Sequence, residues 1–276
     1  MMKSVCLAGP KSWLIQLIWK KIDNNCRIDN NKHRYLLFYC MYVYKYKNAE
    51  CVRDGIRAMM IEKDDFGSLT QAAYEIIKAK IVNGELKQGE VISIVAMAKK
   101  LNISRTPVTY ACQKLENDKF LTIVPKQGVV INTLTIDDAR EIYELRAAIE
   151  SYSAKRAFDH FTRADIDYLE KSYEKQVHAV KTNNAHLFML EDTDFHKYLL
   201  TRYENAQFFS IVNNLFDRAF LIGLKSCKNS LRLAESLEEH RRIIDCLIAK
   251  DKSGFVEEIE KNVLNGYVSL TAHYIS

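Results

Sequence analysis

The stretch Ile103-Ser104-Arg105-Thr106-Pro107-Val108 predicts the start of a short helix with two contrasting faces. Ser104 is placed to cap this helix, and Pro107 is tolerated because a first helical turn has no acceptor for an amide hydrogen. One face is an apolar stripe at helical spacing, formed by Val108, Ala111, Cys112 and Leu115. The other face is polar and carries Arg105, Thr109 and Gln113 one turn apart, with Thr106 and Tyr110 beside them. The major groove of DNA accepts such a helix, so we expect these polar side chains and Ser104 to contact DNA.

Two further helices are expected on the N-terminal side of this stretch. Ser68-Leu69-Thr70-Gln71 has the pattern of a capping box and predicts a first helix that ends at Asn83-Gly84. Ser93 is expected to cap a second helix that Asn102 ends. The order of these elements predicts a helix-turn-helix.

A β-hairpin is expected on the C-terminal side. Two β-branched runs, 121–124 and 129–131, flank the tip Pro125-Lys126-Gln127-Gly128. The hairpin is a candidate wing, with Lys126, Gln127 and Gly128 placed to contact DNA. Helix pairs and hairpins also occur in small protein-interaction modules. Periodicity alone does not distinguish a DNA-binding domain from such a module.

The motif 103–108, with Leu115-Glu116 and Gly128 at their spacings, closely resembles the DNA-binding signature of the GntR superfamily of bacterial transcription regulators. The resemblance implies a winged helix-turn-helix that binds palindromic operators as a dimer. Two arginines usual in the family are replaced here, by Thr109 and by Val95. Arg105, with Lys126, should therefore carry much of the base or phosphate contact, and binding should be weaker or the operator unusual.

Composition separates the chain into parts with different partners. The chain has 276 residues, and its net charge is +5 over residues 1–67, +4 over 68–134 and −4 over 135–276. The basic segment 68–134 is expected to bind DNA, whereas the acidic segment 135–276 is not. Seven cysteines without a CxxC pair fit neither a disulfide framework nor a cysteine-ligated zinc site, which favours a reducing cytoplasm.

Residues 1–67 form an atypical N-terminal extension, rich in aromatic residues and Asn-rich turns. Its longest apolar run has ten residues, Tyr35–Tyr44, too short to span a bilayer, so no membrane partner is expected. We expect a disordered segment or a mis-assigned start, with translation beginning at Met59 or Met60. An interfacial membrane anchor is the alternative.

From Thr135 onward the chain has no proline and is broken at helix-length intervals. Six helices are expected, and antiparallel packing of their apolar stripes makes an all-α bundle. The expected starts are Asp137, Arg163, Ala185, Ala206, Leu231 and Ser253.

A possible metal site is carried by two of these helices. Asp192 and His196 lie one turn apart on one face, and His240 lies on a later helix. A carboxylate and two imidazoles from separate helices can hold a divalent metal. A solvated ion pair is the usual alternative for such spacing.

A second resemblance covers the bundle. Glu144-x-Arg146-x-x-x-Glu150, Asp192-x-x-Phe-His196 followed by Asn205, and Glu239-His240 resemble the FCD effector domain, which defines the FadR branch of the GntR superfamily. It implies that Asp192, His196 and His240 are metal ligands for Zn²⁺, Ni²⁺ or Mn²⁺, with Asn262 in place of the expected fourth histidine. Because of Asn262, a three-ligand site completed by water or an effector carboxylate and an empty polar pocket are the alternatives. The resemblance also implies a small organic acid as effector, and Arg146 is its candidate carboxylate partner. A salt bridge from Arg146 to Glu150 or Asp192 is nearly as well supported.

The sequence therefore predicts a mainly α protein with three parts: the extension 1–67, a winged helix-turn-helix over 68–134, and an antiparallel helical bundle over 135–276. The expected function is a cytoplasmic, homodimeric regulator of transcription that binds double-stranded operator DNA and responds to a small carboxylate, as repressor or activator. The alternatives are a metal-dependent helical-bundle enzyme acting on a small carboxylate, and a pure interaction module. No general base, nucleophile or glycine-rich phosphate loop is placed beside the metal motif, so enzymatic activity is not expected.

Overall fold

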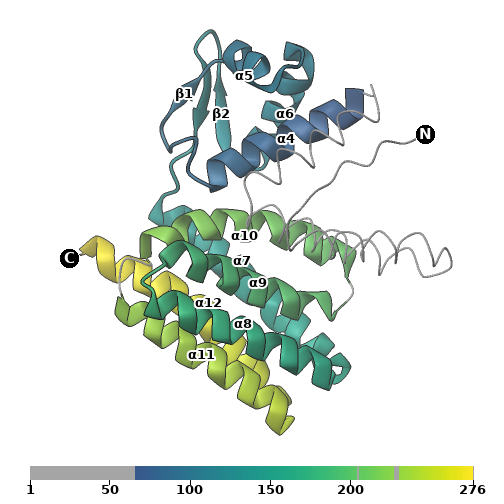
Figure 1. Cartoon of the computed structure of the whole chain (residues 1–276), viewed down its shortest axis with the longest axis vertical. Helices are drawn as coiled ribbons and strands as arrows, with labels where there is room; N and C mark the ends of the chain where they lie inside the picture. The colour runs from purple at the N-terminus through teal and green to yellow at the C-terminus, as the bar shows by residue number, and fades with distance from the viewer. Residues whose placement is uncertain (1–65, 204, 227–229, 276) are drawn as a thin grey trace, which may run out of the picture. The chain divides into compact units, whose positions relative to one another are not determined.

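The computed structural model describes residues 66–203, 205–226 and 230–275 (Figure 1). The extension predicted for residues 1–67 thus lies outside the described residues, apart from its last two. The mainly α fold is confirmed: α4 (Phe66–Val82), β1 (Val91–Ile92), α5 (Ile94–Leu101), α6 (Arg105–Asn117), β2 (Leu121–Val124), β3 (Gly128–Ile131), α7 (Ile136–Ala157), the short 3₁₀ helix η1 (Phe158–His160), α8 (Arg163–Lys181), α9 (Ala185–Thr201), α10 (Ala206–Ser226), α11 (Ser230–Ala249) and α12 (Lys252–Ile275). None of the described helices is long and apolar enough to cross a membrane.

The N-terminal part is a winged helix-turn-helix built from α4, α5, α6 and a small antiparallel sheet. The strand order is β1-β3-β2, with Leu121 opposite Ile131 and Val124 opposite Gly128. The hairpin of β2 and β3 was expected, but β1 was not, because two residues give no alternating pattern that could be recognised. β1 pairs with β3 through Val91 opposite Val130.

Gly128 shows why the hairpin needs a glycine at its tip. Its φ of 122° is unfavourable for residues with a side chain. A Cβ atom there would lie 2.5 Å from the backbone oxygen of Ile92. Gly128 therefore allows β1 to approach the wing.

The helix ends confirm most of the predicted signals, with one correction. Ser93 accepts a hydrogen bond from the Val95 amide, and Asn102 ends α5 in the left-handed conformation. Ser104 is the N-cap residue of α6, although its side chain makes no capping bond. The predicted capping box at Ser68 is wrong, because α4 already includes Phe66 and Ser68 lies inside it.

The C-terminal part is an antiparallel helical bundle, and each of its six helices begins within one residue of the expected position. Capping boxes explain this agreement: Thr135 with Asp138 starts α7, and Thr162 with Asp165 starts α8. Asn205 accepts hydrogen bonds from two amides at the start of α10, so this motif residue is a helix cap.

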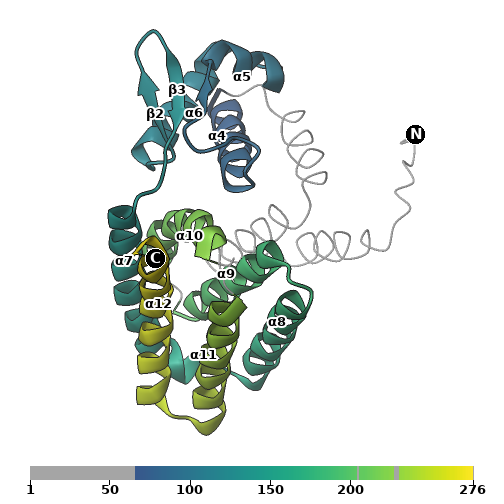
Figure 2. The same ribbon diagram turned by 90° about the vertical axis from the view of Figure 1, so that its left-hand side faces the viewer.

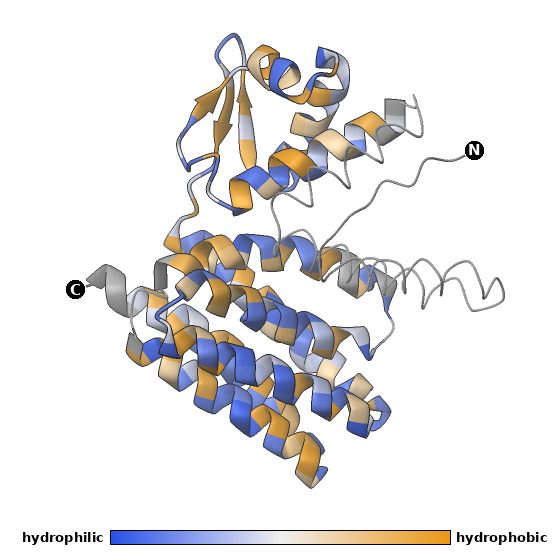
Figure 3. Cartoon of the chain, in the orientation of Figure 1, coloured by the Kyte–Doolittle hydropathy of each residue, from blue (hydrophilic) through white to orange (hydrophobic). Residues whose placement is uncertain are grey.

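Apolar and polar residues recur along each bundle helix (Figure 3), and the buried apolar residues form the core. α7 contacts α12, α9 and α10, while α8 packs on α9 and α11 (Figure 2). A glycine permits close approach of α7 and α12, since a Cβ at Gly266 would lie 2.7 Å from the ring of Tyr143. The core between α9, α11 and α12 includes Phe195, Ile243, Ile244 and Phe255.

Candidate DNA-contacting face and metal centre

The polar face of α6 is exposed as its spacing predicts. Arg105, Thr106, Tyr110 and Gln113 are exposed, while the apolar stripe on the opposite face is fully buried. Thr109 is half-buried, and its hydroxyl donates a 3.0 Å hydrogen bond to the backbone oxygen of Arg105. Thr109, at the position where the family has an arginine, is thus hydrogen-bonded to the backbone of its own helix.

The wing and α5 add further positions. Lys126 and Gln127 are exposed at the hairpin tip, whereas Gly128 is half-buried and serves the backbone turn. Val95, the second position without the family arginine, is 51% exposed on α5. Lys99 and Lys100 are also exposed, in the last turn of α5. They were not predicted to contact DNA, although the two adjacent lysines are visible in the sequence.

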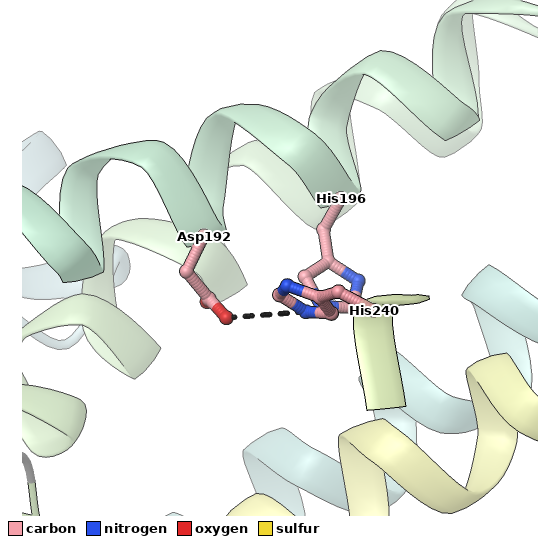
Figure 4. Close-up of side chains that lie close together, drawn as sticks. All are labelled: Asp192, His196 and His240. Atoms are coloured by element: carbon pink, nitrogen blue, oxygen red, sulfur yellow. Dashed lines mark ion pairs between the residues drawn. The ribbon is translucent and has the colours of Figure 1, made fainter. Parts of the chain in front are cut away.

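The three predicted metal ligands converge inside the bundle. Asp192 and His196 come from α9 and His240 from α11, and their side chains point into the same space (Figure 4). One ligand atom from each lies within 4.8 Å of the others. His240 Nε2 is 3.5 Å from Asp192 Oδ1. The ordinary surface ion pair is therefore the wrong interpretation for this motif, because both imidazoles are buried.

Both imidazoles are held with one nitrogen turned toward this space. Nδ1 of His196 lies 2.7 Å from Oε2 of Glu150, and Nδ1 of His240 lies 2.6 Å from Oε1 of Gln176. Arg146 holds Glu150 as an acceptor, so His196 donates from Nδ1. Gln176 donates its amide to the backbone oxygen of Glu191, which leaves Oε1 to accept from His240. In each ring, Nε2 then keeps its lone pair for a metal.

His240 is prepared for metal binding by its surroundings. Burial, opposed by Asp192 and assisted by His196 and Arg232, lowers its pKa to about 3. The ring is thus neutral at pH 7, and among the described residues its buried Nε2 has no hydrogen-bond partner. A buried, neutral, unpartnered imidazole nitrogen beside a carboxylate fits a divalent cation.

A cavity of about 50 Å³ adjoins the cluster. Asp192, His196, Arg146, Arg232 and Asn262 all line it. A cavity of this volume has room for a few water-sized groups.

The buried Arg146 reaches this cavity from α7. Its Nε donates to Oε1 of Glu150 at 2.7 Å, which confirms the salt bridge that the sequence offered as an alternative role. The guanidinium also lies 4.5 Å from the centre of the Phe216 ring. Burial opposes the charge, but Glu150 and other anionic neighbours raise the pKa of Arg146, so the charge is kept.

Several site residues were missed from the sequence. Glu150 had a signal, because it lies one turn after Arg146 in the quoted motif. Gln176 and Arg232 had none, since nothing in their local sequence shows that α8 and α11 bring them to the cluster. Three further histidines, His160, His178 and His186, are exposed and are not part of the cluster.

A winged helix-turn-helix followed by a helical bundle with a buried polar cavity defines a class of protein, the DNA-binding transcription regulators with a separate regulatory domain. Profiles of two families match: the gntR family of bacterial regulatory proteins over residues 69–131, and the FCD domain over residues 141–263. Named relatives agree with this class.

A transcriptional regulator of Agrobacterium vitis, from the TAR-I ttuE-ttuC' intergenic region, is 32% identical over 132 residues, 47% of this chain and 77% of that protein. The gluconate operon transcriptional repressor of Bacillus subtilis is 25% identical over 206 residues, 70% of this chain and 80% of that protein. The solved structure of Escherichia coli McbR/YncC shares the fold, with a TM-score of 0.65, 22% identity, and coverage of 75% of this chain and 98% of that one.

The chain belongs to the GntR family of transcription regulators and carries the FCD domain of the FadR-like branch. It is a DNA-binding regulator rather than the metal-dependent enzyme or the interaction module that the sequence also allowed.

Proposed function

We propose that the protein is a cytoplasmic homodimer that binds a palindromic operator and changes its operator affinity when the bundle binds a small organic acid beside a divalent metal. The division falls at residues 68–134 for DNA binding and 135–276 for sensing and dimerisation. One observation carries the proposal. Asp192, His196 and His240 form a cluster, and Asp192 and His196 line a cavity that Arg146 also lines, in the same chain as an exposed recognition helix.

On the DNA side, α6 enters the major groove and the wing follows the phosphate backbone. The contacting residues are Ser104, Arg105, Thr106, Thr109, Tyr110, Gln113, Lys126, Gln127 and Gly128. Arg105 is the main cation of the helix, because a guanidinium can donate two hydrogen bonds to one guanine. Thr109 contributes less, since its hydroxyl is directed to its own backbone.

Dimerisation is supported by exposed apolar side chains on two contacting helices of the bundle. Leu145 and Tyr152 are about half exposed on α7, and Ile211 is 54% exposed on α10. A monomer gains nothing by leaving such side chains in water, and a second copy would cover them. A two-fold dimer would also place two recognition helices in successive major grooves.

On the effector side, a carboxylate is the class of ligand that the cavity favours. Arg146 supplies a guanidinium, and a metal held by Asp192, His196 and His240 would supply a Lewis acid for one carboxylate oxygen. Asn262 stands where a fourth ligand is expected. The name of the gluconate operon repressor links a relative to an operon for a sugar acid, which is consistent with this class. Differential binding to two arrangements of the dimer would change operator affinity.

The test is an anisotropy titration of the full chain against DNA from upstream of its own gene. It is run at two salt concentrations beside a scrambled duplex. We expect salt-sensitive binding that prefers the native duplex and weakens in Arg105→Ala. Equal weak binding to both duplexes, together with no effect of Arg105→Ala, would contradict the assignment of α6.

A further inference from the structure

Glu239 is a buried carboxylate on α11 that receives four N–H donors, two on each oxygen. Arg232 donates to Oε1 at 2.9 Å and to Oε2 at 2.8 Å. Asn265 donates to Oε1 at 2.9 Å, and Asn262 donates to Oε2 at 2.7 Å. Glu239 is only 4% exposed. Both oxygens of Glu239 therefore act as hydrogen-bond acceptors, one pair of N–H donors on each.

This carboxylate fixes the orientation of the Asn262 amide. An asparagine side chain can present either its NH₂ or its oxygen to a neighbour. Asn262 donates from Nδ2 to Oε2 of Glu239, so its Oδ1 is turned away from that carboxylate. Asn262 is buried and lines the same cavity as Asp192 and His196.

The cavity that Asn262 lines indicates where Oδ1 is directed. Asp192 and His196 line the same cavity, so an Oδ1 turned away from Glu239 is on the side of the ligand cluster. No hydrogen bond of ordinary geometry reaches His240 Nε2 among the described residues. The oxygen of Asn262, Nε2 of His240 and the carboxylate of Asp192 can then all supply lone pairs to one divalent cation.

We propose that Glu239, held by Arg232, is a positioning residue that orients the carbonyl oxygen of Asn262 as the fourth metal ligand, and that this N₂O₂ ligand set favours Mn²⁺ relative to Zn²⁺ more than a third imidazole would. The proposal rests on the metal site of the proposed function. Glu239 itself is not a ligand, because its four donors occupy its lone pairs. Oxygen ligands suit Mn²⁺, whereas imidazole suits Zn²⁺ and Ni²⁺, so replacing one imidazole by an amide oxygen changes the relative affinities.

The test measures Mn²⁺ and Zn²⁺ dissociation constants by calorimetry on the full chain after chelator treatment, with the electron paramagnetic resonance spectrum of bound Mn²⁺ as an independent readout. Glu239→Gln should weaken Mn²⁺ binding roughly 10- to 100-fold, the usual cost of losing an outer-shell partner, and should change the spectrum. Asn262→His should raise the ratio of Zn²⁺ affinity to Mn²⁺ affinity by at least about tenfold.

Asn265→Ala is the matched control, because Asn265 donates to the same carboxylate but does not line the cavity. It should leave both dissociation constants unchanged. Asn262→Ala provides a second route if Glu239→Gln does not fold, and it should weaken Mn²⁺ binding by a similar factor.

Two results separate the proposals. If the wild-type chain binds metal but Asn262→Ala and Glu239→Gln bind Mn²⁺ as tightly as wild type, the positioning role of Glu239 is wrong and the metal site stands. If the wild-type chain binds neither Mn²⁺ nor Zn²⁺, the metal site of the proposed function is wrong as well.

Discussion

The winged domain and the bundle both depend on polar side chains, but they hold them in opposite ways. On α6, Arg105 and Gln113 are exposed. The helix packs against its domain through the apolar stripe on the opposite face, so these two side chains are not needed for packing. In the bundle, Arg146, Glu150 and His196 are buried and are bonded to one another. A substitution on α6 should therefore change binding alone, whereas one in the bundle should change stability and binding together.

The largest effect is expected from Arg146→Ala. It leaves the buried carboxylate of Glu150 with His196 as its main partner, and losing one member of a buried ion pair costs about 3–5 kcal/mol. The free energy of unfolding, measured with urea, checks this. The control is Arg140→Ala on the same helix, whose exposed pair with Glu144 should contribute less than about 1 kcal/mol. Equal losses in the two variants would remove the contrast between buried and exposed pairs.

On the winged domain, Arg105→Ala should weaken operator binding by about 1–3 kcal/mol if its contact is bidentate to a base. The unfolding free energy should stay within about 0.5 kcal/mol of wild type, because the side chain is exposed. Anisotropy and urea titrations of the same preparations measure the two quantities. A loss of stability as large as the loss of affinity would mean that Arg105 is structural.

The pH dependence of the unfolding free energy should reflect a buried histidine of the bundle rather than the winged domain. The pKa of folded His240 is about 3, below the usual 6.5, because of its burial. Between these values the unfolded chain binds a proton that the folded chain does not, so the unfolding free energy should fall as the pH decreases from about 6.5 toward 3. Urea titrations with a chelator present measure it. His240→Gln should flatten this part of the profile, while His178→Gln, at an exposed position, should not.

The smallest effect is expected from Asp165→Asn at the start of α8. Burial opposes ionisation of Asp165, but hydrogen bonds from Tyr198 and Thr162 outweigh it and lower the pKa of its carboxyl. The ionised carboxylate therefore stabilises the fold above the pKa of the unfolded chain, and this contribution is lost as the pH falls through the lower folded value. Loss of the cap should cost about 1 kcal/mol at pH 7, and the difference from wild type should shrink toward pH 3. A constant difference would contradict the ionised cap.

The comparison also shows what the sequence can specify. Helix starts at Arg163, Ala185 and Ala206 were predicted because the capping residues lie beside them in the chain. The ligand motif of Asp192 and His196 was visible because both residues lie on one helix. The start of α4 and strand β1 were missed, the first because Ser68 resembles a cap and the second because two residues carry no period.

The contacts that hold the metal ligands could not be predicted from the sequence, although Glu150 itself was visible in the motif with Arg146. Glu150 and Gln176 meet His196 and His240 only after α7, α8, α9 and α11 have packed. The sequence separations are 46 and 64 residues, and no local pattern encodes contacts over such distances. Glu239 was seen as a motif residue, but its four donors come from two helices.

The central claim is that the ligand cluster in the bundle controls DNA affinity, and the most direct measurement is operator affinity as a function of bound metal and carboxylate. The wild-type chain and His240→Ala are titrated against the same operator by anisotropy, first after chelator treatment, then with Mn²⁺ or Zn²⁺, and then with a panel of small organic acids. We predict that both proteins bind the operator alike after chelation, and that only the wild-type affinity changes, by about 5- to 150-fold, when metal and an effective acid are added. An operator affinity that responds equally in His240→Ala, or one that no metal and acid of the panel alters in wild type, would contradict the claim.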